Sequence, residues 1–106
     1  AQDEMAPLHL FLVPASSREI LERMLRNLQT IHAQAEDAPQ LLAVLHRLIV
    51  LRPQEYSHYR DRGLVLAQLG QRDAALQDLQ TYVRHAPAPQ DLPLIEARIE
   101  LLRAEP

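Results

Sequence analysis

The chain has 106 residues, of which 47% are hydrophobic, 24% are charged and 4% are aromatic, and its formal net charge is −3. This length predicts one domain with a modest core, and the composition is that of an ordinary globular protein. The scarcity of aromatic residues favours helices packed by aliphatic side chains over a β-sandwich. The acidic balance argues against a dedicated nucleic-acid binder, because the phosphate backbone attracts a strongly basic surface.

Cysteine is absent from the chain, which excludes disulfides, thiolate metal sites and a cysteine nucleophile. The absence is compatible with a reducing compartment, and we expect a cytoplasmic protein. No segment approaches the roughly 18 consecutive apolar residues that cross a bilayer, so we expect no membrane partner. The chain begins with Ala1 rather than methionine, which is compatible with a fragment of a longer protein.

Residues 1–15 differ in character from the rest of the chain. The apolar run Leu8–Val13 is short and is stopped by Pro14, which predicts a strand or an extended arm. Because the sequence after it looks helical, such a strand has no pairing partner within this chain. We expect the arm either to lie against the helices or to pair with a segment outside the chain.

Residues 16–53 predict two helices. The first starts at Ser16 or the next residue, since Ser16 and Glu19 fit a capping box. Asp37 and Pro39 mark the start of the second helix. The residues expected on the apolar sides are Ile20, Leu21, Met24, Leu25, Leu28, Ile31 and His32 in the first helix and Leu41, Leu42, Leu45, Leu48 and Ile49 in the second.

A third helix is predicted from about Gln54 to Leu69. Gly70 closes it, because glycine readily adopts the left-handed conformation that ends many helices. A fourth helix begins near Arg72 or the next residue and stops before Pro87.

A fifth helix is predicted over about residues 91–103, after an alternation of alanine and proline. Asp91 is its expected cap, and Pro93 suits its first turn. The residues expected to face inward are Leu94, Ile95, Ile99 and Leu102.

A pattern of residues recurs after 34 positions in this chain. The second copy consists of Tyr59, Gly63, Leu66, Gly70, Ala75, Leu79 and Pro87. The corresponding positions of the first copy hold Leu25, Gln29, His32, Glu36, Leu41, Leu45 and Pro53. The proline spacing is 87 − 53 = 34, and the large apolar residues keep their places. This period is typical of stacked helix-turn-helix repeats.

The second copy resembles the consensus of the tetratricopeptide repeat, in which small residues let two helices approach closely. Ala75 is the small residue at the helix crossing, and Tyr59 stands where the family prefers an aromatic side chain. The first copy keeps the apolar frame but has Gln29 and Leu41 in place of small residues. The resemblance implies an all-α fold, a right-handed α-solenoid fragment of two helical hairpins with a C-terminal capping helix.

The implied repeats cover about residues 22–55 and 56–89, followed by the capping helix at about 91–103. Together they form an expected repeat domain over residues 16–106.

Three strings, residues 22–28, 60–63 and 75–83, also resemble the C-terminal part of the bacterial SirB-type family, and the similarity covers about residues 8–103. Members of that family join an N-terminal transglutaminase-like domain to a helical repeat tail. The resemblance implies that such a domain precedes this chain and that residues 1–15 are its exit segment.

In a tetratricopeptide stack the first helix of each hairpin lines the concave side, which the resemblance makes the candidate partner-binding surface. The expected residues of this surface are Arg23, Arg26, Asn27, Thr30, Arg60, Asp61 and Leu64. The arginines could hold an acidic or C-terminal peptide segment through charge-assisted hydrogen bonds.

This surface departs from the family's carboxylate-clamp pattern. Asp61 stands where that pattern has asparagine, and Leu94 and Ile95 stand where it has basic residues. A second interpretation is therefore kept open, in which Arg60, Asp61 and Arg62 form structural ion pairs or a solvated surface.

Neither a metal centre nor a catalytic centre is expected. The chain has five histidines, and His32 with Glu36 supplies two ligands at helical spacing, whereas zinc sites need at least three protein ligands. The sequence contains no P-loop, nucleophile elbow or dinucleotide-binding motif. We expect no cofactor, no metal and no independent enzymatic activity.

The leading functional hypothesis is a non-enzymatic scaffold that binds a partner protein or peptide, or an upstream transglutaminase-like domain, through the concave face. The alternative is a structural or homodimerisation module that buries an apolar N-terminal end carrying Ile20, Met24 and Leu8–Val13. Two hairpins are fewer than the three or more repeats that usually give stability, which supports this alternative. Nucleic-acid binding through the arginines is disfavoured by the net charge.

Overall fold

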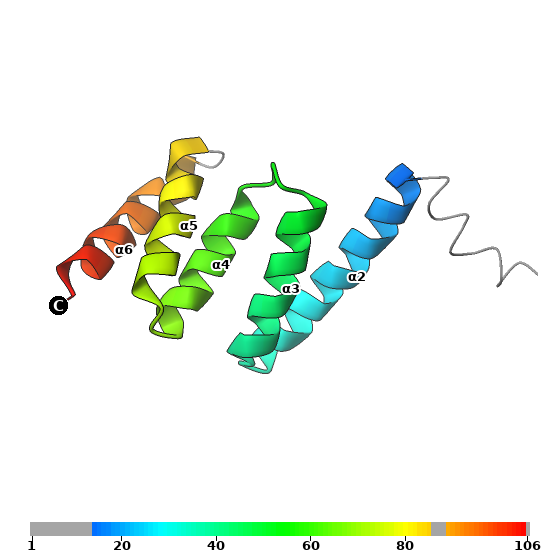
Figure 1. Cartoon of the computed structure of the whole chain (residues 1–106), viewed down its shortest axis with the longest axis horizontal. Coiled ribbons are helices and arrows are strands. Elements are labelled where there is room, and N and C mark those ends of the chain that lie inside the picture. Colours follow the sequence, from blue (N-terminus) through cyan, green and yellow to red (C-terminus); the bar gives the residue numbers. More distant parts are fainter. Residues whose placement is uncertain (1–13, 86–88, 106) are drawn as a thin grey trace, which may run out of the picture.

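The computed structural model of the protein describes residues 14–85 and 89–105. Its helices are α2 (Pro14–Gln34), α3 (Ala38–Leu51), α4 (Ser57–Gln68), α5 (Arg72–His85), the short 3-10 helix η1 (Pro89–Asp91) and α6 (Leu92–Ala104). Each helix packs on its neighbours in the chain, so the helices form one array with α2 and α6 at opposite ends (Figure 1). The all-α prediction is confirmed, and the predicted arm at Leu8–Val13 lies outside the described residues.

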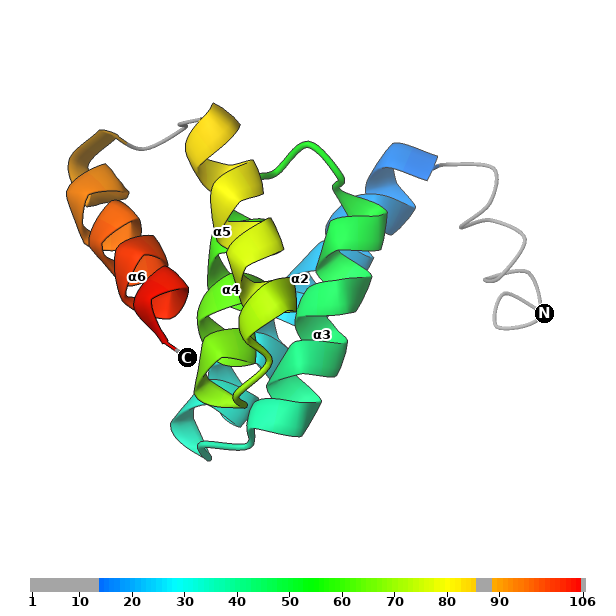
Figure 2. The same ribbon diagram turned by 60° about the vertical axis from the view of Figure 1, so that its left-hand side comes forward.

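The five α-helices of the described residues follow the predicted plan of two hairpins and a terminal helix. The first hairpin is formed by α2 and α3 and the second by α4 and α5, while α6 packs on α5. Helices α2 and α4 lie in one layer, and α3 and α5 lie in the other (Figure 2).

The predicted start of the first helix is wrong. Helix α2 begins at Pro14, so Ser16 lies inside the helix instead of capping it. Proline suits this place, because the first turn needs no N–H donor and the ring holds φ near the helical value. The third predicted helix also starts late, at Ser57 rather than near Gln54. The intervening residues form a turn in which the N–H of Glu55 donates to the carbonyl of Arg52.

The predicted start of α3 is confirmed. The Asp37 carboxylate accepts a hydrogen bond from the backbone N–H of Gln40 at 3.3 Å, and a proline occupies the first turn. The side chain thereby satisfies one of the helix donors that have no partner within the helix.

The hydrophobic core consists of two clusters. The first joins Val44, Leu45 and Leu48 of α3 to Val65 of α4, with Leu25 of α2 packed against it. The buried members of the second cluster are Leu66, Ala75, Leu79, Tyr82, Ile95, Ile99 and Leu102. The core predictions for α3 and α6 are largely confirmed, but the inward prediction for Leu94 is wrong because this side chain is 72% exposed. Helix α6 buries residues 95, 99 and 102, which form one helical stripe about 100° away from residue 94. In α2, five of the residues predicted for the apolar side are exposed, namely Ile20, Leu21, Met24, Leu28 and Ile31.

Gly63 permits the close crossing of α4 and α5. A Cβ atom at this position would lie 2.8 Å from Leu79 Cγ and 3.2 Å from the carbonyl oxygen of Ala75. Gly70, which follows α4, has φ of +79°, the left-handed conformation expected for a helix-ending glycine. Both glycines of the second repeat therefore have a structural cause.

A buried ion pair joins the same two helices. The guanidinium of Arg62 donates to both carboxylate oxygens of Asp78, at 2.6 and 2.8 Å, and Asp78 is 5% exposed. These hydrogen bonds raise the pKa of Arg62 despite its partial burial. The bidentate pair allows the charge of Arg62 to remain beside the core.

Asp91 occupies the N-cap position of α6, as predicted, but its side chain does not cap the helix. Its carboxylate makes no capping hydrogen bond to α6. One oxygen accepts from the Tyr82 hydroxyl at 2.6 Å, and the other accepts from Arg60 at 2.9 Å. Hydrogen bonds from these two donors hold the pKa of Asp91 below its usual value. The residue therefore ties α6 to α4 and α5.

Candidate functional site

A surface hollow of about 580 Å³ lies between α2 and α4, and we call it the α2–α4 hollow. Its lining residues are Arg26, Gln29, Thr30, Ala33, Gln34, Ser57 and His58. On α2 these residues recur at helical spacing and so form one stripe, while Ser57 and His58 come from the first turn of α4. The first helices of the two hairpins together build the hollow.

His58 is the distinctive residue of the α2–α4 hollow. It is 4% exposed, and neither of its ring nitrogens has a hydrogen-bond partner among the residues that the structure describes. Burial lowers the pKa of His58, and this effect outweighs the raising influence of Asp61, Glu55 and Glu22. The ring is therefore neutral at pH 7, with one N–H donor and one acceptor both unused. Each unsatisfied buried group costs about 1–3 kcal/mol of stability.

Two of the predicted surface residues, Arg26 and Thr30, lie in the α2–α4 hollow. The Arg26 guanidinium donates to Glu22 at 2.8 Å, and its side chain remains 55% exposed. The Thr30 hydroxyl donates to the Arg26 carbonyl at 3.2 Å, so its oxygen can still accept a hydrogen bond.

Arg23 and Asn27 are also exposed on α2 but do not line the hollow.

Arg60, Asp61 and Leu64 occupy a different part of α4. Arg60 donates to Asp61 at 3.0 Å and to Asp91 at 2.9 Å, and its guanidinium lies 5.5 Å from the centre of the Tyr82 ring. Burial lowers the pKa of Arg60, but these hydrogen bonds outweigh it and the net shift is upward. Asp61 also accepts from Gln29 of α2 at 3.4 Å, which links the two helices. Leu64 is half-buried against the second core cluster.

The sequence prediction missed five residues of the hollow, which are Gln29, Ala33, Gln34, Ser57 and His58. Gln34 continues the i, i+4 series from Arg26 and Thr30, so extending the predicted stripe by one turn would have found it. No sequence signal marks His58, because the loss of its hydrogen-bond partners depends on how α2 and α4 pack.

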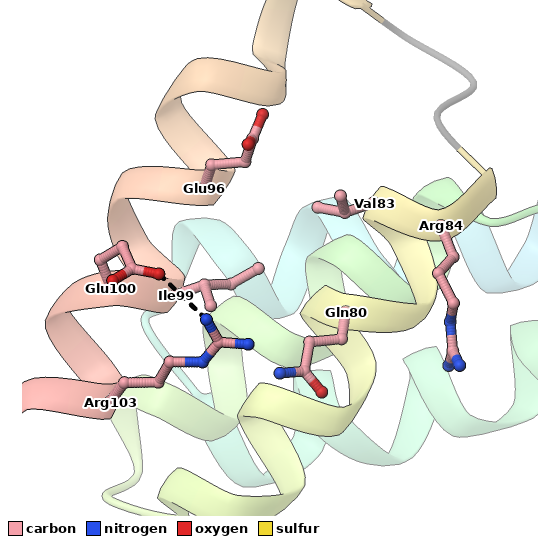
Figure 3. Close-up of a pocket in the computed structure, with 7 residues that line it drawn as sticks. All are labelled: Gln80, Val83, Arg84, Glu96, Ile99, Glu100 and Arg103. Atoms are coloured by element: carbon pink, nitrogen blue, oxygen red, sulfur yellow. Dashed lines mark hydrogen bonds and ion pairs between the residues drawn. The ribbon is translucent and has the colours of Figure 1, made fainter.

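Two further hollows are lined differently. One of about 430 Å³ lies between α5 and α6, where Val83 and Ile99 are flanked by charged side chains (Figure 3). Arg103 donates to Glu100 at 3.0 Å at its edge. Another, of about 450 Å³, includes the Arg62–Asp78 pair and several apolar residues. Of these hollows, the one between α2 and α4 contains the buried side chain that lacks partners.

The outer surface of α2 carries an exposed apolar stripe. Its members are Ile20, Leu21, Met24, Leu28 and Ile31, with exposed fractions between 38% and 56%. Four of them, Leu21, Met24, Leu28 and Ile31, alternate at spacings of three and four, as in a helix–helix seam. This observation accords with the apolar N-terminal end expected from the sequence.

Within residues 14–85 and 89–105, no group of three or more metal-ligating side chains occurs. None of the helices in this part of the chain is long and apolar enough to cross a membrane.

A family model described as tetratricopeptide repeat matches residues 28–100. The chain belongs to the tetratricopeptide repeat family. The match begins in the last third of α2 and runs through α3, α4 and α5 into α6, in agreement with the stacked helices and with the small residues at the α4–α5 crossing. Tetratricopeptide repeats form extended concave surfaces that serve protein–protein interaction.

The chain is also similar to longer bacterial proteins. It is 34% identical over 99 residues to the UPF0162 protein of Xylella fastidiosa strain Temecula1, covering 93% of this chain and 35% of that protein. It is 28% identical over 88 residues to the Protein SirB1 of Salmonella typhimurium, covering 83% of this chain and 33% of that protein. The chain thus spans about a third of the length of these relatives. No solved structure matches it.

Proposed function

We propose that this tetratricopeptide domain is a non-enzymatic scaffold that binds an extended segment of a partner protein across α2 and α4. The observation that carries the proposal is the α2–α4 hollow, where two neighbouring repeats present polar side chains beside a buried histidine without partners. A rigid helical array orders these groups before binding, which lowers the conformational cost of association.

Arg26 and Thr30 are the predicted residues that the proposal uses directly. Arg23 and Asn27 extend the same exposed helix surface along the path of a bound segment. Arg60 and Asp61 have a supporting role, since their ion pairs with each other and with Asp91 hold α4 in place beside the hollow.

The partner segment can also belong to an upstream domain of the same protein. The chain corresponds to about a third of its longer relatives, and the resemblance to the SirB-type family implies a transglutaminase-like domain in that position. Both forms of the proposal use the same surface and differ in whether the segment is intramolecular.

The proposal is tested by selecting displayed random peptides on the wild-type domain and measuring the affinity of the retained peptides by calorimetry. We expect Thr30→Glu to weaken their binding, because it places a longer, negatively charged side chain in the hollow. Gln77→Glu on α5 is the matched control, since Gln77 is exposed and lines the hollow that contains Arg62 and Asp78. Retained peptides that bind Thr30→Glu as tightly as the wild type would contradict the proposal.

The exposed stripe on α2 supports a second candidate function, a structural or homodimerisation module. The residues of the stripe are alternately three and four positions apart, which is the pattern that packs against another helix. That helix would come from a second copy of the chain or from another domain. For the homodimer we expect the molar mass from light scattering to rise with concentration and Met24→Asp to keep the chain monomeric. Leu94→Asp on α6 is the control, because Leu94 is 72% exposed at the opposite end of the array. A wild-type chain that stays monomeric would exclude the homodimer.

A further inference from the structure

The α2–α4 hollow offers mainly uncharged hydrogen-bonding groups. Apart from Ala33 and Arg26, its lining consists of two glutamines, two hydroxyl side chains and the neutral ring of His58. Amides, hydroxyls and a neutral imidazole can each donate and accept. Such a lining complements a ligand group that also does both.

The charges around the hollow largely cancel. On α2, Glu22 pairs with Arg26 at 2.8 Å and also with Arg52 at 3.1 Å. On α4, Asp61 pairs with Arg60 at 2.9 Å. Glu55, before α4, is exposed and accepts from Ser57.

An anionic ligand group would meet the carboxylates that act on His58, and a cationic group would meet Arg26. The surroundings therefore favour an uncharged polar group over either charged one.

We propose that the α2–α4 hollow recognises a carboxamide, the side chain of an asparagine or glutamine in an extended peptide, through the buried ring of His58. This inference rests on the proposed scaffold function and names the ligand chemistry of the same site. The ring N–H donates to the carboxamide oxygen, and the other ring nitrogen accepts an N–H of the bound segment. Access requires nearby rim side chains to move, and Arg26 and Gln34 are long side chains at exposed positions.

His58 then has a functional cause for its unsatisfied state. A histidine that serves packing alone is expected to form hydrogen bonds to other groups of the fold. The ring of His58 instead retains an unused donor and an unused acceptor, which a ligand can engage. Replacing it with phenylalanine removes both unused groups while keeping a ring of similar size. We therefore expect His58→Phe to raise the melting temperature and to weaken peptide binding at the same time, a combination that a purely structural residue does not produce.

The experiment sequences the displayed random peptides that the wild-type domain retains. Asparagine or glutamine should be enriched at one position, and its replacement in a synthetic peptide by aspartate or glutamate should lower the affinity about tenfold. His58→Phe should lower it by a similar factor, while His58→Gln, which keeps a donor and an acceptor, should retain most of the binding. His46→Gln is the matched control, because His46 is exposed on α3 and lines a different hollow.

The direction of the pH dependence separates a carboxamide from a carboxylate. As the pH falls through the lowered pKa of His58, protonation of the ring removes its acceptor, so carboxamide binding should weaken. A carboxylate ligand should bind more tightly at the lower pH, because it would pair with the imidazolium. The same titration on His58→Phe should show little of this dependence.

Three outcomes contradict the inference. Enrichment of acidic residues with tighter binding at low pH would replace the carboxamide with a carboxylate and leave the scaffold function standing. Peptides that depend on Thr30 but bind His58→Phe normally would assign the contact to other residues of the hollow. A selection that retains no peptide, or retained peptides whose affinity does not change in Thr30→Glu, would contradict the scaffold function and this inference together.

Discussion

The two junctions that α4 forms, one with α5 and one with α2, are built very differently. Between α4 and α5, Gly63 allows a close crossing, the core cluster is buried and Arg62 pairs bidentately with Asp78. Between α2 and α4 the structure has an open hollow and a histidine without hydrogen-bond partners. The first junction satisfies its buried groups internally, whereas the second leaves groups available for a ligand. Stability and binding are thus concentrated in different parts of a small domain.

The largest effect is expected from Leu79→Ala in the α4–α5 junction. Leu79 is fully buried, so the truncation leaves a cavity and should reduce the free energy of unfolding by about 2–5 kcal/mol. Leu21→Ala on α2 is the matched control; its side chain is 46% exposed, and we expect a change within about 0.5 kcal/mol. Urea denaturation of both variants measures the difference. Equal losses would show that the two regions contribute alike.

A somewhat smaller effect is expected from Asp78→Ala. The change removes both acceptors of the Arg62 guanidinium and should cost about 1.5–3 kcal/mol, the range for hydrogen bonds to charged groups. Asp73→Ala is the control on the same helix, because the Asp73 side chain is 93% exposed. Denaturation at matched pH gives both values. An Asp78→Ala variant as stable as the control would mean that the ion pair contributes nothing net to stability.

Gly63→Ala tests the close crossing itself. The added methyl group must displace Leu79 or separate the helices, and we expect a loss of about 1–3 kcal/mol from overpacking. Alanine favours helix by about 1 kcal/mol relative to glycine, so the measured loss lies at the lower end of this range. Thermal unfolding by circular dichroism measures it. A stabilised variant would show that the crossing has room for a side chain.

The smallest effect concerns the pH dependence of the α2–α4 junction. Because the pKa of His58 is lowered from 6.5 in the folded protein, the unfolded chain takes up a proton first as the pH falls. The contribution of His58 to the free energy of unfolding is therefore constant while the pH is above the unfolded-state pKa of 6.5. It decreases as the pH falls below that pKa and levels off once the folded ring is protonated. The difference between wild type and His58→Phe isolates this contribution. A difference that does not vary with pH would contradict the lowered pKa.

The hairpins could be predicted from the sequence because each repeat residue acts over a short range. Gly70 ends α4 through its own backbone conformation, and Ala75 lies where the helix crossing needs a small side chain. The errors at Asp91 and Leu94 arose where a tertiary contact competed with a local preference. Asp91 is a good capping residue, but Tyr82 and Arg60 hold its carboxylate instead. The exposure of Leu94 likewise follows from the angle at which α6 packs on α5.

The sequence by itself determined the all-α class, the repeat period and the stripe of α2 that contains Arg26 and Thr30, because helical spacing places such residues on one side. Only the tertiary structure decided which of the predicted surface residues remain available and which are held by ion pairs. It also decided the state of His58, since burial and the absence of a partner depend on atoms supplied by a neighbouring helix. Local periodicity contains no information about those distances, and the binding chemistry of this domain depends on them.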